Sequence, residues 1–134
     1  MIALDTNVLL RVIVADDAGQ HARALAFLRS FNTGPGEEPR LFVAPVVLCE
    51  LVWVLKTVFG RSRGEVAAIL QGILDSRELL TGDRSAIEAS LRAYREGRGG
   101  FADYFVRESS RRAGCESVAT FEKALLKEEG FRAV

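Results

Sequence analysis

Hydrophobic residues along this chain fall into two patterns that alternate from one end to the other. Short apolar runs bounded by polar or turn-forming residues predict β-strands at 2–4, 41–43, 78–81, 117–120 and 131–134. Between them, apolar residues at helical spacing predict helices at about 8–13, 18–31, 45–55, 63–74, 83–96, from 101 onward, and 122–129. Strands that alternate with helices predict an α/β fold with a mostly parallel sheet of four to five short strands.

Individual residues mark where several of these helices begin. Thr6 or Asn7 can cap the first helix, and Pro45 fits the first turn of the third. Ser62, with Glu65 three positions later, has the spacing of a capping box for the fourth. The buried faces that we predict for the second and fourth helices are Ala22, Leu25, Ala26 and Leu28, and Val66, Ile69, Leu70, Ile73 and Leu74.

The length and charge of the chain narrow its class. A chain of 134 residues suits one domain that buries its core without disulfides or structural zinc. Its 18 basic and 18 acidic side chains balance, so no long-range field draws it to nucleic acid or anionic membranes. Three local basic groups could still bind phosphates, or could be ordinary solvated helix faces: Arg61 and Arg63; Arg92, Arg95 and Arg98; Arg107, Arg111 and Arg112.

The cysteines and apolar segments limit the chemistry and the location. Cys49 and Cys115 lie far apart without a CxxC spacing, and His21 is the single histidine, so zinc and thiol chemistry have little support. No signal peptide is visible at the start, and no apolar run is long enough to span a membrane. We therefore expect a soluble, cytoplasmic protein.

The candidate catalytic and metal-binding residues are the acids at helix starts or among apolar neighbours: Asp5, Glu50, Asp103 and Glu122. Carboxylates are seldom buried without a partner, so such acids from distant parts of a short chain invite a shared explanation. In a parallel sheet, ligands gather outside the carboxyl ends of strands, where Asp5 and Glu122 are expected. Structural alternatives remain open: a helix cap or dipole partner for Asp5, Asp103 and Glu122, and a buried pair with an arginine for Glu50.

The chain resembles the PIN-domain ribonucleases, specifically the VapC-type toxins of bacterial toxin–antitoxin pairs. The segments that carry the resemblance are Met1–Leu10, Val47–Leu55, Phe101–Tyr104 and Thr120–Lys123, in this order. The resemblance spans nearly the whole chain and implies a single three-layer α/β/α domain over residues 1–134. It also implies that the candidate acids bind Mg²⁺ or Mn²⁺, with Thr6, Asn7 and Thr120 in supporting positions.

Two departures from the family pattern affect these expectations. Glu122 stands where an aspartate is usual and is one methylene longer, which bears on the fourth ligand. Tyr104 and Phe105 are bulkier than the residues that often follow the third acid, so they could narrow the cleft.

The resemblance implies a metal-dependent endoribonuclease that hydrolyses RNA phosphodiester bonds. Oxygen ligands suit Mg²⁺, and a bound ion polarises the scissile phosphate and makes a bound water more acidic. No Ser–His or Cys–His pair is apparent, so a covalent intermediate has no obvious carrier. Whether the RNA is tRNA, rRNA or mRNA stays open.

The resemblance also implies protein partners, namely a second copy in a homodimer and a cognate antitoxin that covers the active-site groove. The hydrophobic fraction of 49% leaves room for such contacts. We expect the helices around 8–14 and 46–59 to supply part of the groove.

Two other functions are compatible with parts of the pattern. A non-catalytic PIN-like module would bind protein or RNA without cutting it, and Glu122 keeps that alternative open. A phosphoacceptor receiver domain also places acids at strand ends, but Asp83 is a loose match for its phosphorylated residue and Lys123 starts a helix instead of ending a strand.

Overall fold

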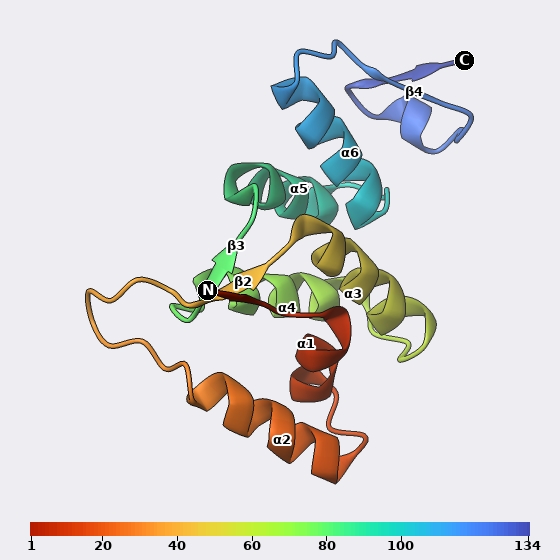
Figure 1. Ribbon diagram of the computed structural model, residues 1–134. Coiled ribbons are helices and arrows are strands. Elements are labelled where there is room, and N and C mark those ends of the chain that lie inside the picture. The colour runs from red at the N-terminus through yellow and green to blue at the C-terminus, as the bar shows by residue number, and fades with distance from the viewer. The chain divides into compact units, whose positions relative to one another are not determined.

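The computed structural model describes residues 1–134, which form two compact units, Met1–Gly82 and Asp83–Val134 (Figure 1). The first unit contains β1 (Ile2–Ala3), α1 (Thr6–Ile13), α2 (Ala18–Arg29), β2 (Leu41–Val43), α3 (Pro45–Thr57), α4 (Arg63–Asp75) and β3 (Leu79–Thr81). The second contains α5 (Arg84–Glu96), α6 (Phe101–Arg112), β4 (Val118–Thr120), the 3₁₀ turn η1 (Leu125–Lys127) and β5 (Phe131–Ala133). The predicted α/β class is confirmed, because helices and parallel strands occur together in each unit. The prediction of one sheet of four to five strands is wrong, because the strands form one sheet of three and another of two. The single domain over 1–134 stays a prediction.

The first unit is built on a parallel three-stranded sheet with the order β1-β2-β3 (Figure 1). Leu41 of β2 pairs with Ile2 on one side and Leu79 on the other. Because the strands run the same way, their carboxyl ends share one edge, and α1 and α3 begin shortly after β1 and β2. The sheet therefore brings the amino ends of these helices to a common edge.

Aliphatic side chains fill the core of the first unit. Helix α3 packs against α1 and α4, and its side toward them is fully buried. The capping box of α4 is confirmed, since Ser62 Oγ accepts from Glu65 N at 3.2 Å and Glu65 Oε1 accepts from Ser62 N at 3.3 Å. Its predicted stripe is confirmed too, except that Ile69 is only half-buried. The largest fully buried aliphatic side chains of this unit are Leu41, Val43, Leu48, Leu51, Leu55, Val66 and Leu70.

The predicted cap of α1 is wrong. The cap is Asp5, whose backbone is extended, whereas Thr6 and Asn7 already belong to the helix. Thr6 is buried with 3% of its surface exposed, and its hydroxyl donates to Glu50 of α3 instead of capping α1. Asp5, Thr6 and Asn7 can each cap a helix, so the sequence did not show which of them is the cap.

The predicted buried face of α2 is also wrong. Ala22 and Ala26 are exposed and Leu25 is half-buried, while Ala24 is the buried residue of this helix. Helix α2 packs on α1, and only the strip facing that helix loses water contact. A helix with one packing partner buries a narrow strip, and its many alanines make the strip's position ambiguous in the sequence.

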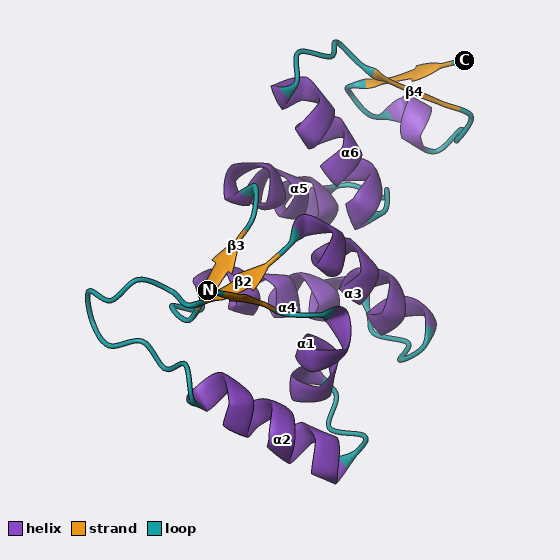
Figure 2. Cartoon of the chain, viewed as in Figure 1, coloured by secondary structure: helices purple, strands orange, loops and turns teal.

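In the second unit, α5 packs along α6, and β4 pairs in parallel with β5 (Figure 2). Tyr94 of α5 and Phe101 of α6 are buried and meet edge to face, with ring centroids 6.1 Å apart. The predicted helix at 122–129 is wrong, because only the turn η1 forms there. The register pairs Val118 with Phe131, so the short connection must return the chain to the start of a parallel strand. Too few residues of this connection remain for a regular helix.

All the helices are short. The longest, α3, α4 and α5, have 13 residues each, whereas a helix that crosses a bilayer needs roughly 20 apolar residues. None of the helices has the length and apolar character that crossing a membrane requires.

Candidate functional site

Asp5 lies between the carboxyl end of β1 and the first turn of α1, as the sequence predicts. A capping side chain ordinarily accepts from the second or third N–H of its helix, and Asp17 does so at α2 by accepting from Gln20 N at 2.9 Å. Asp5 Oδ1 accepts instead from the adjacent Thr6 N, at 2.8 Å. Asp5 therefore occupies the cap position without making the usual capping bond, and its carboxylate is exposed to solvent.

Thr6 connects the two candidate acids of the first unit. Its hydroxyl donates to Glu50 Oε2 at 3.0 Å, while its backbone N–H donates to Asp5 Oδ1. Asp5 and Glu50 are far apart in the chain, so this pairing depends on the packing of α1 against α3. One buried threonine thus holds a carboxylate on each side of it.

Glu50 differs from the sequence expectation in its surroundings. We expected an acid enclosed by apolar neighbours, with a buried arginine pair as the structural alternative, but Glu50 is exposed and its hydrogen-bond partner is Thr6. Val46 and Trp53, on the same side of α3, are 69% and 63% exposed. Helix α3 is apolar on both sides, so its pattern did not reveal which side faces the core. An exposed carboxylate is free to bind a cation without the cost of burying its charge.

Asp103 lies in the first turn of α6 and is half-buried. Its Oδ2 accepts from Gly100 N at 2.9 Å, so the side chain reaches back over the helix start. A single Cβ on Gly100 would lie 2.8 Å from Asp103 Oδ2, so the glycine makes this close approach possible. The expectation that the next residue narrows a cleft is wrong for Tyr104, whose ring is completely buried in the second unit.

Glu122 follows β4 and is exposed. Thr120 Oγ1 accepts from Glu122 N at 3.0 Å, and the supporting role of Thr120 in the site stays a prediction. Asn7 is exposed in the first turn of α1. These polar groups are available to solvent or ligand.

The structure divides the candidate acids between the units, with Asp5 and Glu50 in the first and Asp103 and Glu122 in the second. Within each unit, acidic, histidine and cysteine side chains do not gather in groups of three or more suited to a metal ion. Asp5 and Glu50 supply hard oxygen atoms, as do Asp103 and Glu122, and oxygen donors suit Mg²⁺ and Mn²⁺. The metal set of four acids stays a prediction.

A groove of about 360 Å³ runs between α1 and α2, and Asn7 is among the residues that line it. Val8, Ala24 and Phe27 supply its apolar wall, and Arg11 and Arg23 supply positive charge. We expected the helices at 8–14 and 46–59 to form such a groove. The first of them lines it, but its partner in this groove is α2.

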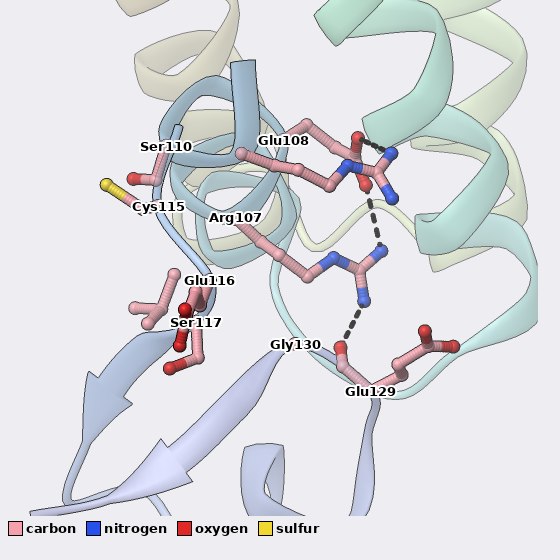
Figure 3. A pocket seen from close by; sticks show the side chains of 10 residues that line it. Arg107, Glu108, Ser110, Cys115, Glu116, Ser117, Glu129 and Gly130 are labelled. Carbon is pink, nitrogen blue, oxygen red and sulfur yellow. Dashed lines mark hydrogen bonds and ion pairs between the residues drawn. The ribbon is translucent and has the colours of Figure 1, made fainter. Parts of the chain in front are cut away.

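A second group of charged side chains was missed by the sequence analysis. Glu108 is 3% exposed and its carboxylate pairs with Arg107 at 3.3 Å (Figure 3). The same carboxylate pairs with Arg111 at 2.6 Å and with Arg112 at 2.9 Å. Arg107 also donates to the backbone carbonyl of Glu129 at 3.0 Å. The third basic group of the sequence is therefore an ion-pair network centred on Glu108. The spacing of Arg111 and Arg112, three and four residues after Glu108, could have revealed it.

These arginines determine the ionisation of Glu108. Burial of the carboxyl by itself raises its pKa, but the hydrogen bond from Arg112 and the charges of Arg111 and Arg107 outweigh burial, and the pKa is lowered overall. Cys49 shows the opposite case, because burial raises the pKa of its thiol. The thiol is thereby kept protonated, in line with the expectation that thiol chemistry has little support.

Comparison with known proteins identifies the fold family. The family model described as PIN domain matches residues 2–128 and therefore runs through both units. No curated protein matches the chain.

Proposed function

The chain belongs to the PIN-domain family, and we propose that it is a metal-dependent endoribonuclease that acts as the toxin of a toxin–antitoxin pair. PIN domains are generally nucleases, and those nucleases typically use divalent metal ions. The α/β architecture with parallel strands agrees with the three-layer α/β/α fold of the family.

The observation that carries the proposal is the pair of carboxylates held by Thr6. Asp5 is the cap residue before α1, Glu50 lies on α3, and they bond to the N–H and hydroxyl of the same buried residue. Like charges repel, and nothing about the stability of either helix requires both acids beside one threonine. A divalent cation between them would offset that repulsion.

Asp103 and Glu122 complete the ligand set in this proposal. Asp103 uses Oδ2 for its bond with Gly100 N, which leaves Oδ1 for a ligand. A bound Mg²⁺ or Mn²⁺ supplies electrostatic stabilisation of charge that develops on the scissile phosphate, and it acidifies water. The chain's own part is to orient the four carboxylates and to hold the RNA phosphate beside them.

RNA binding and protein partners form the remainder of the proposal. The exposed arginines Arg92 and Arg98 are available for phosphates, whereas the arginines around Glu108 are engaged in ion pairs. An antitoxin segment fits the α1–α2 groove, where an apolar wall is flanked by Arg11 and Arg23. Val46 and Trp53 of α3 and Val58 at its C-cap are exposed apolar residues that support a further contact, which we assign to a second copy in a cytoplasmic homodimer.

The test of the catalytic proposal is cleavage of a labelled pool of cellular RNA that includes tRNA and rRNA, with Mg²⁺, with Mn²⁺ and with excess chelator. We expect chelator to abolish cleavage, and Asp5→Asn and Asp103→Asn each to lower its rate by at least about a hundredfold. Asp17→Asn is the matched control, because Asp17 is also a helix-capping aspartate of the first unit and makes only the capping bond.

The non-catalytic module gives a different result in the same experiment. RNA or protein binding would then persist without any metal-dependent cleavage. Cleavage that survives both Asp5→Asn and Asp103→Asn would refute the metal site. Glu122→Asp restores the side-chain length that is usual in the family. If the residue at this position is the fourth metal ligand, this variant should still cleave RNA.

A further inference from the structure

A glycine-containing turn, residues 97–100, leads into α6 and depends on close contacts with Tyr104. A Cβ on Gly97 would clash directly with the Tyr104 hydroxyl, and one on Gly99 would lie 3.0 Å from the same hydroxyl. A larger residue at position 97 or 99 would therefore fit only if the tyrosine moved. The turn and Tyr104 are therefore fitted to each other.

The Tyr104 hydroxyl links this turn to the segment before β5. It accepts from Gly99 N at 2.9 Å and donates to Glu128 Oε1 at 2.6 Å. Glu128 Oε1 also accepts from Arg98 N at 3.2 Å. Tyr104 is completely buried and Glu128 is half-buried, so water competes poorly for these bonds.

Successive backbone N–H groups of the turn are thus held by three different carboxylate or hydroxyl groups. Arg98 N bonds to Glu128, Gly99 N to Tyr104 and Gly100 N to Asp103. Asp103 is the neighbour of Tyr104 in the same helical turn. The direction of the Asp103 carboxylate therefore depends on a turn whose other attachments are Tyr104 and Glu128.

We propose that Tyr104 and Glu128 are positioning residues for Asp103, which they hold in the orientation needed to bind a divalent cation. This inference rests on the proposed function, because it takes Asp103 as a metal ligand. In this proposal both residues act through the 97–100 turn, and neither is a metal ligand. Groups that orient a ligand from behind commonly change metal affinity by about ten- to a hundredfold when they are removed.

The bulky residue after the third acid has a purpose in this arrangement. A small or aliphatic residue in place of Tyr104 has no hydroxyl to bridge Gly99 N and Glu128. The glycines and the tyrosine depend on one another, because the turn can approach the ring only where Gly97 and Gly99 lack side chains. Tyr104→Phe keeps the ring and removes only the bridge.

The experiment measures Mn²⁺ affinity of the full chain by electron paramagnetic resonance, alongside amide hydrogen exchange at Gly99 and Gly100. We expect Tyr104→Phe and Glu128→Ala to weaken Mn²⁺ binding about tenfold or more. Exchange at the two glycines should rise roughly three- to tenfold in Tyr104→Phe, as for loss of one hydrogen bond. Glu128→Gln keeps an accepting oxygen and should restore affinity to within about threefold of wild type.

Glu129→Ala is the control, because it removes a neighbouring glutamate whose backbone carbonyl, and not its side chain, accepts from Arg107. Its Mn²⁺ affinity should equal that of the wild type. If Glu128→Ala fails to fold, Tyr104→Phe decides, because it preserves the buried ring.

Two contrary results have distinct meanings. If Asp103→Asn weakens Mn²⁺ binding while Tyr104→Phe and Glu128→Ala do not, the positioning role is wrong and the proposed function stands. If Asp103→Asn itself leaves Mn²⁺ binding unchanged, Asp103 is not a ligand, and both proposals fail at this residue.

Discussion

The two units hold their candidate acids by different means. In the first, α1 and α3 are fixed by an aliphatic core, and one threonine links Asp5 to Glu50. In the second, contacts of ionised side chains also hold the backbone in place. Glu128 bonds to the turn before Asp103, and Glu108 pairs with arginines of α6. Aliphatic packing does not depend on the protonation of side chains, whereas ionised groups respond to pH and their attraction is screened by salt. The two units should therefore lose their structure under different conditions.

The largest expected effect concerns the aliphatic core of the first unit. Leu51→Ala removes a side chain of α3 that has no exposed surface and should cost about 3 kcal/mol of unfolding free energy. Trp53→Ala, on the exposed side of the same helix, removes more atoms yet should cost less than about 1 kcal/mol. Urea unfolding measures both. Equal losses would mean that α3 buries its other side as well.

The next effect tests the ion pairs around Glu108 in the second unit. Glu108→Gln keeps the shape of the side chain but leaves Arg107, Arg111 and Arg112 without their carboxylate. We expect a loss of about 2 kcal/mol, below the usual cost of breaking a buried pair because Arg111 is 67% exposed. Glu88→Gln, which breaks the exposed pair with Arg84, should cost less than about 0.5 kcal/mol. A result for Glu108→Gln as small as for Glu88→Gln would remove the contrast between the units.

Acid should weaken the second unit before the first. Burial by itself raises the pKa of both Glu108 and Glu128. Arginines lower the pKa of Glu108, and the Tyr104 hydroxyl and backbone N–H groups lower that of Glu128, so the pKa of each carboxyl is lowered overall. Carboxyls with a lowered folded pKa stabilise the fold above their unfolded pKa, roughly 4.3, and that contribution is lost as pH falls through the lower folded value.

Hydrogen exchange between pH 6 and pH 3, corrected for the intrinsic rate, measures this difference. Protection of α6 should fall before protection of α3. The first unit also contains Glu65 and Glu78, whose pKa values are lowered by the hydroxyls of Ser62 and Ser76, but these are surface contacts of small effect. Glu108→Gln should make α6 less sensitive to acid, and an unchanged profile in that variant would contradict the assignment.

Local patterns predicted most of the elements because each depends on neighbouring residues. Ser62 and Glu65 form a capping box within four positions, and Pro45 begins α3 where its missing N–H has no cost. The failures concern longer-range constraints. The face of α2 depends on its having one packing partner, and the helix expected at 122–129 is prevented by the parallel pairing of β4 with β5.

The same division applies to the candidate site. The acids were found because each stands in a short recognisable segment, but the surroundings of Glu50 depend on which side of α3 faces the core. The bond between Tyr104 and Glu128 joins positions 24 apart in the chain and leaves no local pattern. Arg111 and Arg112 lie on the same helix as Glu108, three and four residues after it. Their ion pairs with Glu108 could therefore be predicted from helical spacing.

The smallest expected effect concerns the link in the first unit. Thr6→Val keeps the shape of a buried side chain and removes the hydroxyl that donates to Glu50, which should cost about 1 kcal/mol of stability. Because the hydroxyl orients a proposed ligand, RNA cleavage should fall by about tenfold, whereas Thr6→Ser should cleave almost normally. Cleavage rates and urea unfolding of the two variants separate these effects. Thr6→Val with normal cleavage would show that packing alone orients Glu50, and the contrast between an aliphatic first unit and a hydrogen-bonded second unit would become sharper.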